Sequence, residues 1–365
     1  MAQNHVKEKY KNLKFINKSY DINEIINNFS KIYEEDEILV ITDKYNYENT
    51  IKIVPQNCNV VLCEGASIDF AEQVRKQNEY DRVIAIGGCS ALDVGRFCGL
   101  YAKKEKSIIS VPSILSTSCI TANKAILYDI NRNKKTIKTH ISMPTIIPMY
   151  TIKNTREKDL IKWNSSGIGD MLAHISAVLD YLFLKDFLSK SIDIYMYMHE
   201  FFKSTNIINI VKVAEELHNV TANQDLRYIH KDENFLRKLA TWLHSASILS
   251  NECEHIAKGG EHDFFYSIFK LKKYSTELPT HGQLVAIGTL IVAKIVSKYY
   301  KQDEIYNLLR IVYKSIGLPT NLSDLEKIKV DIVDIEEAIE KIEGRSLLKT
   351  YFDKKILNEV FNSEN

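Results

Sequence analysis

The sequence lacks the features that mark several classes of protein. Its six cysteines include no Cys-x-x-Cys pair and follow no regular spacing. A chain of 365 residues can bury a core large enough to fold without disulfide bonds, so we expect reduced thiols and a cytoplasmic protein. Residues 1–12 are polar and contain no apolar run, so no secretory signal peptide is expected.

A strong excess of charge of one sign is also missing. The chain carries 48 basic and 47 acidic residues, a formal net charge of +1, which does not favour a nucleic-acid or membrane-surface partner. No long uninterrupted hydrophobic run is present either. The most apolar stretch, residues 286–296, is interrupted by Lys294 and is too short to span a bilayer.

The patterns that are present predict two domains. Residues 1–152 are expected to form an α/β domain, because short apolar runs rich in β-branched residues alternate with helical patterns. This alternation predicts a parallel, doubly wound, Rossmann-like sheet. Its expected strands are Ile38–Ile41, Val60–Leu62, Val83–Ile86 and Ile108–Val111, and its expected helices are Ile68–Asn78 and Ser90–Lys104.

The pattern then changes. The segment Lys124–Met143 holds two short strand candidates around a polar turn, which predicts a β-hairpin. Residues 153–365 are expected to form an all-helical second domain, because helical periodicity dominates there, as in Leu236–Ile256 and Val285–Tyr300.

A glycine pair follows the third buried strand. Gly87 and Gly88 allow a pyrophosphate to approach the backbone, and the helix expected to begin near Ser90 offers unpaired N–H groups. The pair alone is a weak signal that an ordinary turn would also explain. Asp43 ends the first strand and suits an adenosine ribose, which would favour NAD over NADP; an exposed loop aspartate is the alternative.

Candidate metal ligands lie in the C-terminal half. Asp170 and His174 are four residues apart in a helical pattern, so both project from one helix face. His262 and His281 each stand at a probable helix start. One carboxylate with two or three imidazoles suits zinc or ferrous iron with a position open for substrate. For His174 a structural role remains the alternative.

Together these motifs resemble the iron-containing alcohol dehydrogenase superfamily, which includes glycerol dehydrogenases, glycerol-1-phosphate dehydrogenases and dehydroquinate synthases. The resemblance spans about residues 35–300. It is carried by the Gly-Gly-Gly-Ser-x-x-Asp element, the Val-Pro-Thr-x-x-Ser-Thr loop and three metal-ligand segments. The matching residues here are Gly87–Asp93, Val111–Thr117, Gly169–Asp170, Gly260–His262 and His281–Leu290.

The resemblance implies a dehydroquinate synthase-like fold and assigns roles to particular residues. It places the metal on Asp170, His262 and His281, with His174 as a fourth ligand in the iron-dependent branch. Lys124 would face the substrate and bind its phosphate, although a solvated hairpin lysine is an equal alternative. The nucleotide would be bound by Asp43, Gly87, Gly88, Cys89, Ser90, Asp93, Ser113, Ser116 and Thr117.

Three positions depart from the family pattern. Ser118 or Cys119 stands where an aspartate is usual near the substrate, and Tyr266 replaces a second histidine. Gln283 replaces a glutamate, and we interpret it as half of a capping box with Thr280. Substrate identity and proton relay therefore stay open.

The leading prediction is a metal-dependent NAD(P)H oxidoreductase acting on a small polyol phosphate, with glycerol-1-phosphate and dihydroxyacetone phosphate as the first pair to test. NAD(H) is favoured, with zinc, iron or nickel as the metal and a homo-oligomer as the assembly. The alternatives are a sugar-phosphate cyclase of the dehydroquinate synthase type, which uses NAD transiently, and a nucleotide-binding protein without activity. Net turnover of NADH separates the first two.

Overall fold

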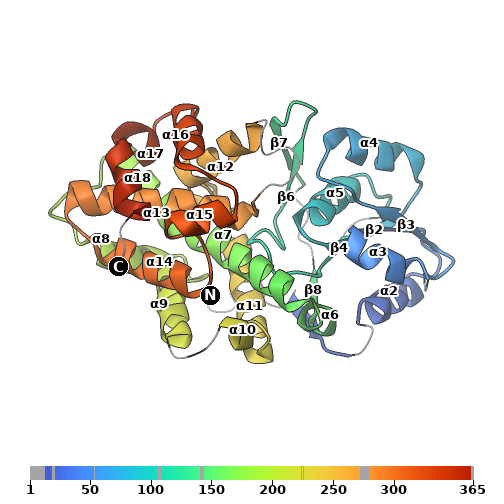
Figure 1. The fold of residues 1–365 in the computed structure, drawn as a ribbon. Helices are drawn as coiled ribbons and strands as arrows, with labels where there is room; N and C mark the ends of the chain where they lie inside the picture. Colours follow the sequence, from blue (N-terminus) through green and yellow to red (C-terminus); the bar gives the residue numbers. More distant parts are fainter. Residues whose placement is uncertain are drawn as a thin grey trace. The chain divides into compact units, whose positions relative to one another are not determined.

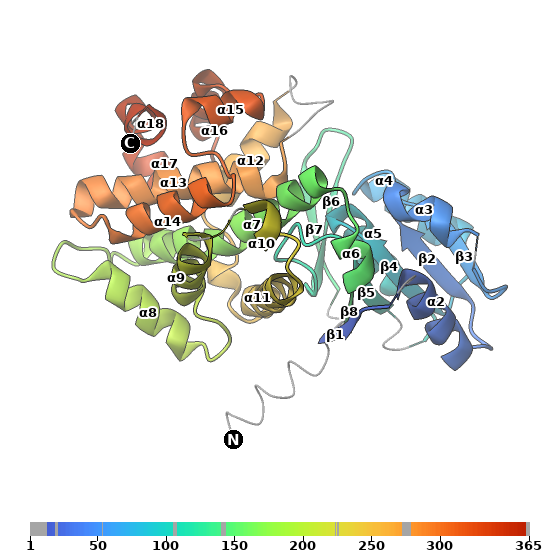
Figure 2. The same ribbon diagram turned by 60° about the horizontal axis from the view of Figure 1, so that its bottom comes forward.

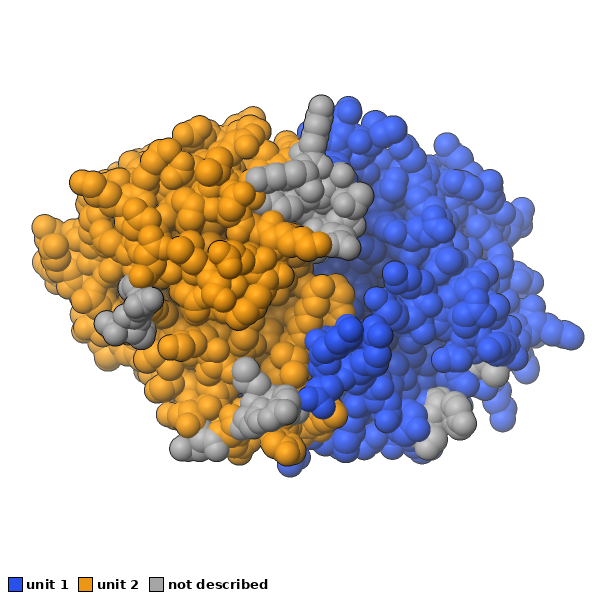
Figure 3. All heavy atoms as spheres, in the orientation of Figure 1, with its two compact units in different colours: residues 1–160, 233–248 blue, residues 161–232, 249–365 orange. Residues whose placement is uncertain are grey.

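The computed structural model, labelled in Figure 1, divides into two compact units (Figure 3). Unit 1 comprises residues 1–160 and 233–248, and unit 2 comprises residues 161–232 and 249–365. The expected domain boundary after residue 152 stays a prediction. The residues that the structure describes are 13–18, 21–52, 54–104, 108–139, 144–222, 224, 226–271 and 279–362, so the end of the predicted hairpin, residues 140–143, lies outside them.

Unit 1 contains a six-stranded sheet in the order β1-β8-β5-β4-β2-β3, which can be followed in Figure 2, and every neighbouring pair is parallel. The four predicted strands are confirmed. The two strands on the β1 side were not predicted, because a strand of four residues with one polar member carries little signal. The strands are β1 (Leu13–Ile16), β2 (Ile38–Thr42), β3 (Cys58–Leu62), β4 (Arg82–Gly87), β5 (Ile108–Pro112) and β8 (Thr145–Pro148).

Both faces of this sheet are covered, which explains the unbroken apolar runs. Leu39 and Ile41 of β2 pack on one face with helices α4 and α5, whereas Ile38 and Val40 pack on the other face with α2. The predicted helix from Ser90 to Lys104 ends earlier, at Gly99. The helices are α2 (Asp21–Ile32), α3 (Lys44–Thr50), α4 (Ile68–Gln77), α5 (Cys89–Gly99) and α6 (Met149–Lys153).

The strand order reverses beside β2. From β2 the chain passes to β3 on one side and then returns to β4 on the other side. In open parallel sheets, ligands bind beyond the carboxyl ends of the strands at such a reversal. Here those ends carry Asp43 after β2 and Gly87–Gly88 at β4, so the topology points to the residues that the sequence pattern singled out.

The predicted hairpin is confirmed within the described residues. Strands β6 (Lys124–Tyr128) and β7 (Lys134–Lys138) pair antiparallel. Ala125 and Leu127 of β6 are buried in the same core cluster as residues of α4 and α5, so one face of the hairpin packs on these two helices. Lys124 lies on the other face, directly opposite Lys138.

From residue 157 onward, every element among the described residues is helical, as predicted. The predicted helices near residues 236–256 and 285–300 are both present and begin a few residues earlier than expected. The elements from residue 157 onward are α7 (Glu157–Leu184), α8 (Ile194–Ser204), α9 (Ile210–Thr221), α10 (Leu226–Ile229), α11 (Glu233–Glu252), η2 (Glu254–Ile256), α12 (Gly260–Lys270), α13 (His281–Tyr300), α14 (Glu304–Ser315), α15 (Leu322–Lys327), α16 (Ile332–Glu340), α17 (Leu347–Tyr351) and α18 (Lys354–Phe361).

Helices α7 and α13 are long and apolar enough to cross a membrane by length and composition. Residues 286–296 were predicted to be too short to span a bilayer, but the helix that contains them has 20 residues. In the structure, 89% of the apolar window of α7 and 78% of that of α13 are buried inside the protein. This burial is what the core helices of a globular unit require.

Candidate functional site

The carboxyl end of β2 is tied to those of β4 and β5 by hydrogen bonds. Asp43 caps helix α3 by accepting bonds from the backbone N–H groups of Tyr45 and Asn46. Its Oδ2 also accepts from the Gly88 N–H at 3.2 Å, and the Asn46 side chain donates to Ser113 Oγ at 2.9 Å. Burial raises the pKa of Asp43, and the hydrogen bonds from Asn46, Gly88 and Tyr45 oppose that rise.

The glycine turn beside Asp43 depends on the absence of a side chain. Gly87 has φ +139°, a conformation that L-residues with a Cβ rarely adopt, and a Cβ there would lie 2.6 Å from Asp43 Oδ2. Gly88 is the N-cap of α5, so Cys89 and Ser90 form the first turn of that helix. The turn therefore presents a helix N-terminus beside a carboxylate, as a dinucleotide site requires.

Asp93 lies one turn further along α5 and is buried with Arg96, whose Nη1 donates to Asp93 Oδ1 at 2.7 Å. The same guanidinium donates to the carbonyl oxygen of Cys119. Arg96 thereby connects α5 to the loop that holds the buried residues Ser116 and Thr117. Arg96 and Asn46 were not predicted as site residues. The signal that could have identified Arg96 is its spacing, three residues after Asp93 on one helix.

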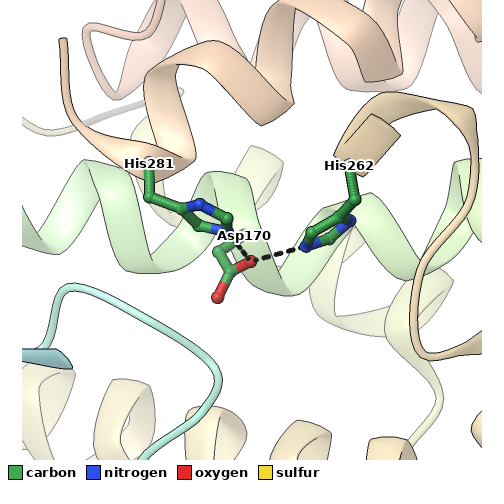
Figure 4. A group of neighbouring side chains, drawn as sticks. All are labelled: Asp170, His262 and His281. Carbon is green, nitrogen blue, oxygen red and sulfur yellow. Dashed lines mark hydrogen bonds and ion pairs between the residues drawn. The ribbon is translucent and has the colours of Figure 1, made fainter. Parts of the chain in front are cut away.

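The three predicted metal ligands of unit 2 come together (Figure 4). Asp170 is in the middle of α7, His262 is in the first turn of α12, and His281 is the first residue of α13. The predicted capping box of Thr280 and Gln283 is present and fixes the start of α13. It explains Gln283 without a catalytic role.

Glycines allow the helices that carry these ligands to approach closely. A Cβ on Gly169 would lie 2.6 Å from the carbonyl oxygen of Gly282, and a Cβ on Gly282 would lie 1.8 Å from that of Ser166. A Cβ on Gly288 would lie 2.8 Å from the Cα of Glu261. The backbone of α13 therefore touches that of α7 beside the ligands and packs tightly against α12.

The distances within the group suit a metal ion. Asp170 Oδ1 lies 3.0 Å from His281 Nε2 and 3.4 Å from His262 Nε2, and one donor atom from each residue lies within 4.8 Å of the others. Donors about 2.0–2.1 Å from a tetrahedral zinc stand roughly 3.4 Å apart. One carboxylate and two imidazoles are also a donor set that zinc and ferrous iron accept.

Burial and charge make the group electrostatically unusual. Asp170 is 1% exposed; burial raises the pKa of its carboxyl, but the imidazoles of His281 and His262 lower it well below its usual range. Burial lowers the pKa of His262, whereas hydrogen bonds to Asp170 and Glu261 raise it, with a net value of about 9. Asp170 is therefore an ionised carboxylate between two imidazoles. A divalent cation and protons would compete for these donor atoms.

His174 lies outside this group of three donor residues, and its role as a fourth ligand stays a prediction. Its Nδ1 lies 2.9 Å from the Met171 carbonyl oxygen, and its Nε2 lies 2.7 Å from Ser250 Oγ. Both ring nitrogens are therefore occupied within the fold. Burial lowers the pKa of His174, which favours the neutral ring among the buried side chains of unit 2.

The raised pKa of His262 predicts how the stability of the metal-free protein depends on pH. Its folded pKa of about 9 exceeds the ordinary value of 6.5, so the folded state binds the extra proton between these values. This stabilisation is fully present below pH 6.5 and is lost as pH rises through 9. The melting temperature of the stripped protein should fall more steeply between pH 6.5 and 9 than that of the stripped His262→Gln variant. Equal dependence of the two melting temperatures on pH would contradict the raised pKa of His262.

Known proteins resemble this chain in sequence and in fold. Residues 18–154 match the family model "Iron-containing alcohol dehydrogenase". The resemblance predicted from the sequence is thereby confirmed. A glycerol-1-phosphate dehydrogenase [NAD(P)+] of Methanococcus maripaludis is 26% identical over 336 residues, which cover 88% of this chain and 92% of that protein. The enzyme of the same name from Archaeoglobus fulgidus is 24% identical over 305 residues, which cover 82% of this chain and 79% of that protein.

Solved structures show the same fold. A probable glycerol dehydrogenase from Sinorhizobium meliloti 1021 superimposes with a TM-score of 0.65 at 14% identity, covering 95% of this chain and 94% of that one. Maleylacetate reductase from Rhizobium sp. strain MTP-10005 superimposes with a TM-score of 0.60 at 14% identity, covering 96% of this chain and 95% of that one. The predicted enzyme class, an NAD(P)-dependent, metal-containing alcohol dehydrogenase, is confirmed and favoured over the cyclase alternative.

Proposed function

We propose that this protein interconverts glycerol-1-phosphate and dihydroxyacetone phosphate, with NAD(H) as the preferred hydride carrier and zinc, or iron or nickel, as the metal. The observation that carries the proposal is the convergence of Asp170, His262 and His281, whose donor atoms lie within 4.8 Å of one another. The names of the relatives from Methanococcus and Archaeoglobus give glycerol-1-phosphate as their substrate, and dihydroxyacetone phosphate is the matching ketone.

Asp170, His262 and His281 would hold the metal. Their elements are fixed by close helix packing and by the capping box, so the three side chains are arranged before a ligand binds. A cation bound there would act as a Lewis acid that polarises the oxygen of the reacting carbonyl or alcohol. The imidazoles of this chain can serve as neutral ligands, and Asp170 supplies negative charge.

The nucleotide would be bound by the carboxyl edge of the sheet in unit 1. Gly87 and Gly88 leave room for a pyrophosphate at the N-terminus of α5, where Cys89 and Ser90 contribute N–H groups. Asp43 would accept hydrogen bonds from the adenosine ribose. Its Oδ1 is already occupied by Tyr45 and Asn46, so Oδ2, which accepts one bond from Gly88, is the oxygen with capacity left. Its charge would repel the additional phosphate of NADP.

Lys124 is the proposed substrate-phosphate ligand. It is half-buried at the start of β6 and directly opposite Lys138, so two ammonium groups extend from one face of the hairpin. A phosphate dianion is the substrate group that such a pair would attract.

Replacing Lys124 by alanine tests this role. The Michaelis constant for dihydroxyacetone phosphate should rise by roughly 10- to 100-fold, as expected when a hydrogen bond between charged groups is lost. The constant for unphosphorylated dihydroxyacetone should stay the same. Lys135→Ala is the matched control, because Lys135 lies on the other face of the hairpin and pairs with Asp129. Equal effects on both substrates would remove phosphate recognition from Lys124.

The proposed reaction is tested by a screen of NADH and NADPH oxidation with stripped protein. Dihydroxyacetone phosphate, dihydroxyacetone and other short ketones and aldehydes would each be combined with zinc, nickel, manganese or ferrous iron. Net oxidation of NADH with the phosphorylated ketone supports the proposal. Conversion of a sugar phosphate without net change in NADH would instead identify a cyclase.

We also expect a cytoplasmic homo-oligomer whose partners are small molecules rather than nucleic acids or membranes. The formal net charge of +1 supports the expectation that nucleic acids are not partners, because a chain with so little excess positive charge is only weakly attracted to a polyphosphate backbone. Light scattering after size-exclusion chromatography measures the assembly directly.

A further inference from the structure

Glu261 stands directly before the proposed ligand His262 and is the most deeply buried carboxylate near the metal group, with 0% exposure. Its Oε1 lies 2.7 Å from His262 Nδ1. We propose that Glu261 is a positioning residue, which fixes the tautomer and orientation of the His262 ring and supplies a second negative charge to the metal centre. This inference rests on the metal site of the proposed function and deepens it.

The geometry of the His262 ring carries the first part of the argument. Nδ1 faces Glu261, whereas Nε2 faces Asp170 Oδ1 at 3.4 Å. An ionised carboxylate only accepts hydrogen bonds, so Nδ1 must carry the proton. In the neutral form, which is the form that binds a metal, the ring then has its lone pair on Nε2, the nitrogen that faces Asp170 (Figure 4). A carboxylate bonded to the outer nitrogen of a metal-binding histidine also increases its basicity.

The Glu261 carboxylate is itself held in place. Its Oε1 accepts a second hydrogen bond from the backbone N–H of Gly259 at 2.7 Å, so the side chain folds back over the turn that begins α12. A Cβ on Gly259 would lie 2.6 Å from Glu261 Oε2, so only glycine leaves room for this arrangement. Asp180 Oδ2 accepts from the N–H of Gly260 and anchors the same turn to α7.

The charge of the buried groups supports the second part. Asp170 and Glu261 together contribute two negative charges in a region with almost no solvent contact, and buried charges need a compensating charge. When both imidazoles are neutral, the two negative charges of Asp170 and Glu261 match the two positive charges of one divalent cation. Asp180, also buried near this turn, is compensated differently, by the N–H groups of Gly260 and Leu347 at the starts of α12 and α17.

The test compares zinc binding by Glu261→Gln and by the control Asp263→Asn. Both changes remove one carboxylate from the first turn of α12, but Asp263 is partly exposed and pairs with Lys258. Zinc dissociation constants would be measured by competition with a chelator on stripped protein, together with the visible spectrum of the cobalt-substituted protein and NADH binding. Loss of such a supporting carboxylate typically weakens metal binding about 10- to 100-fold.

We expect Glu261→Gln to weaken zinc binding by that factor and to shift the cobalt spectrum, while NADH binding stays the same. Asp263→Asn should bind zinc within about twofold of the unmodified protein. Unchanged affinity and spectrum in Glu261→Gln would overturn the inference. If that variant does not fold, Glu261→Asp takes its place, since the shorter carboxylate cannot keep both bonds; unchanged zinc affinity there would equally overturn the inference.

The same experiment separates this inference from the proposed function. If the unmodified protein binds zinc at this group but oxidises no NADH with any ketone, the function fails while the comparison of affinities still decides the role of Glu261. If the unmodified protein binds no divalent metal at all, the metal site and the inference fall together.

Discussion

Replacing Asp170 by asparagine is expected to lower kcat/KM by about 10³-fold or more. The substitution keeps the size of the side chain and removes the charge that lies 3.0 Å from His281 and 3.4 Å from His262. A Lewis-acid metal contributes several kcal/mol to the stabilisation of charge in the transition state, and each 1.36 kcal/mol is a factor of ten in rate. Most of that contribution should disappear with the metal.

The measurement is steady-state NADH oxidation with zinc present, combined with metal analysis of the purified variant. Asp159→Asn is the matched control, because Asp159 lies on the same helix but pairs with Arg156 at the surface. The control should retain full activity. A variant at Asp170 that keeps both its zinc and its activity would show that this carboxylate is not a ligand.

Replacing Gly282 by alanine is expected to destabilise unit 2 and to weaken zinc binding at least tenfold. The added methyl group would lie 1.8 Å from the carbonyl oxygen of Ser166 and 2.7 Å from its Cα, both of which belong to the rigid backbone of α7. Helix α13 must move away, and His281 at its first position moves with it. Overpacking of this kind costs typically about 1–3 kcal/mol, and contact with backbone places this case at the upper end.

Chemical unfolding followed by circular dichroism measures the stability, and chelator competition measures the zinc affinity. Gly65→Ala is the control, since a Cβ at Gly65 meets nothing within 4 Å. We expect the control to behave as the unmodified protein does. If Gly282→Ala is as stable as the unmodified protein and binds zinc as tightly, the close contact between α7 and α13 does not position the ligands.

The fold was predictable where the sequence pattern is strong. Buried parallel strands such as β2 and β4 contain uninterrupted β-branched residues, because both faces of the sheet are covered by apolar side chains. The strands β1 and β8 carry no such signal, since each has only four residues. Their place in the sheet is decided by long-range pairing with each other, which periodicity cannot reveal.

The candidate site was predictable as a set of residues but not as a geometry. Asp170, His262 and His281 could be selected by residue type and by the order of the family motifs, and the structure brings them together. The spacing of Asp170 and His174 suggested one helix face, which is true, yet His174 turns its ring nitrogens to Met171 and Ser250. Spacing along a helix fixes the face and leaves the side-chain direction open.

The supporting residues were missed for a related reason. Glu261 was visible within the Gly-Glu-His motif, but its contact with His262 depends on a side chain folded back over Gly259. Asn46 and Arg96 similarly act through contacts with residues distant in sequence, Ser113 and Cys119. Such bonds form only once the turns and helices have been placed, so a linear pattern does not contain them.

The most direct test of the metal centre is anomalous diffraction from crystals of the zinc-loaded protein, recorded on both sides of the zinc absorption edge. We predict one peak about 2.0–2.2 Å from an Asp170 carboxylate oxygen and from the Nε2 atoms of His262 and His281. Zinc bound elsewhere, with no peak among these three side chains, would contradict the account.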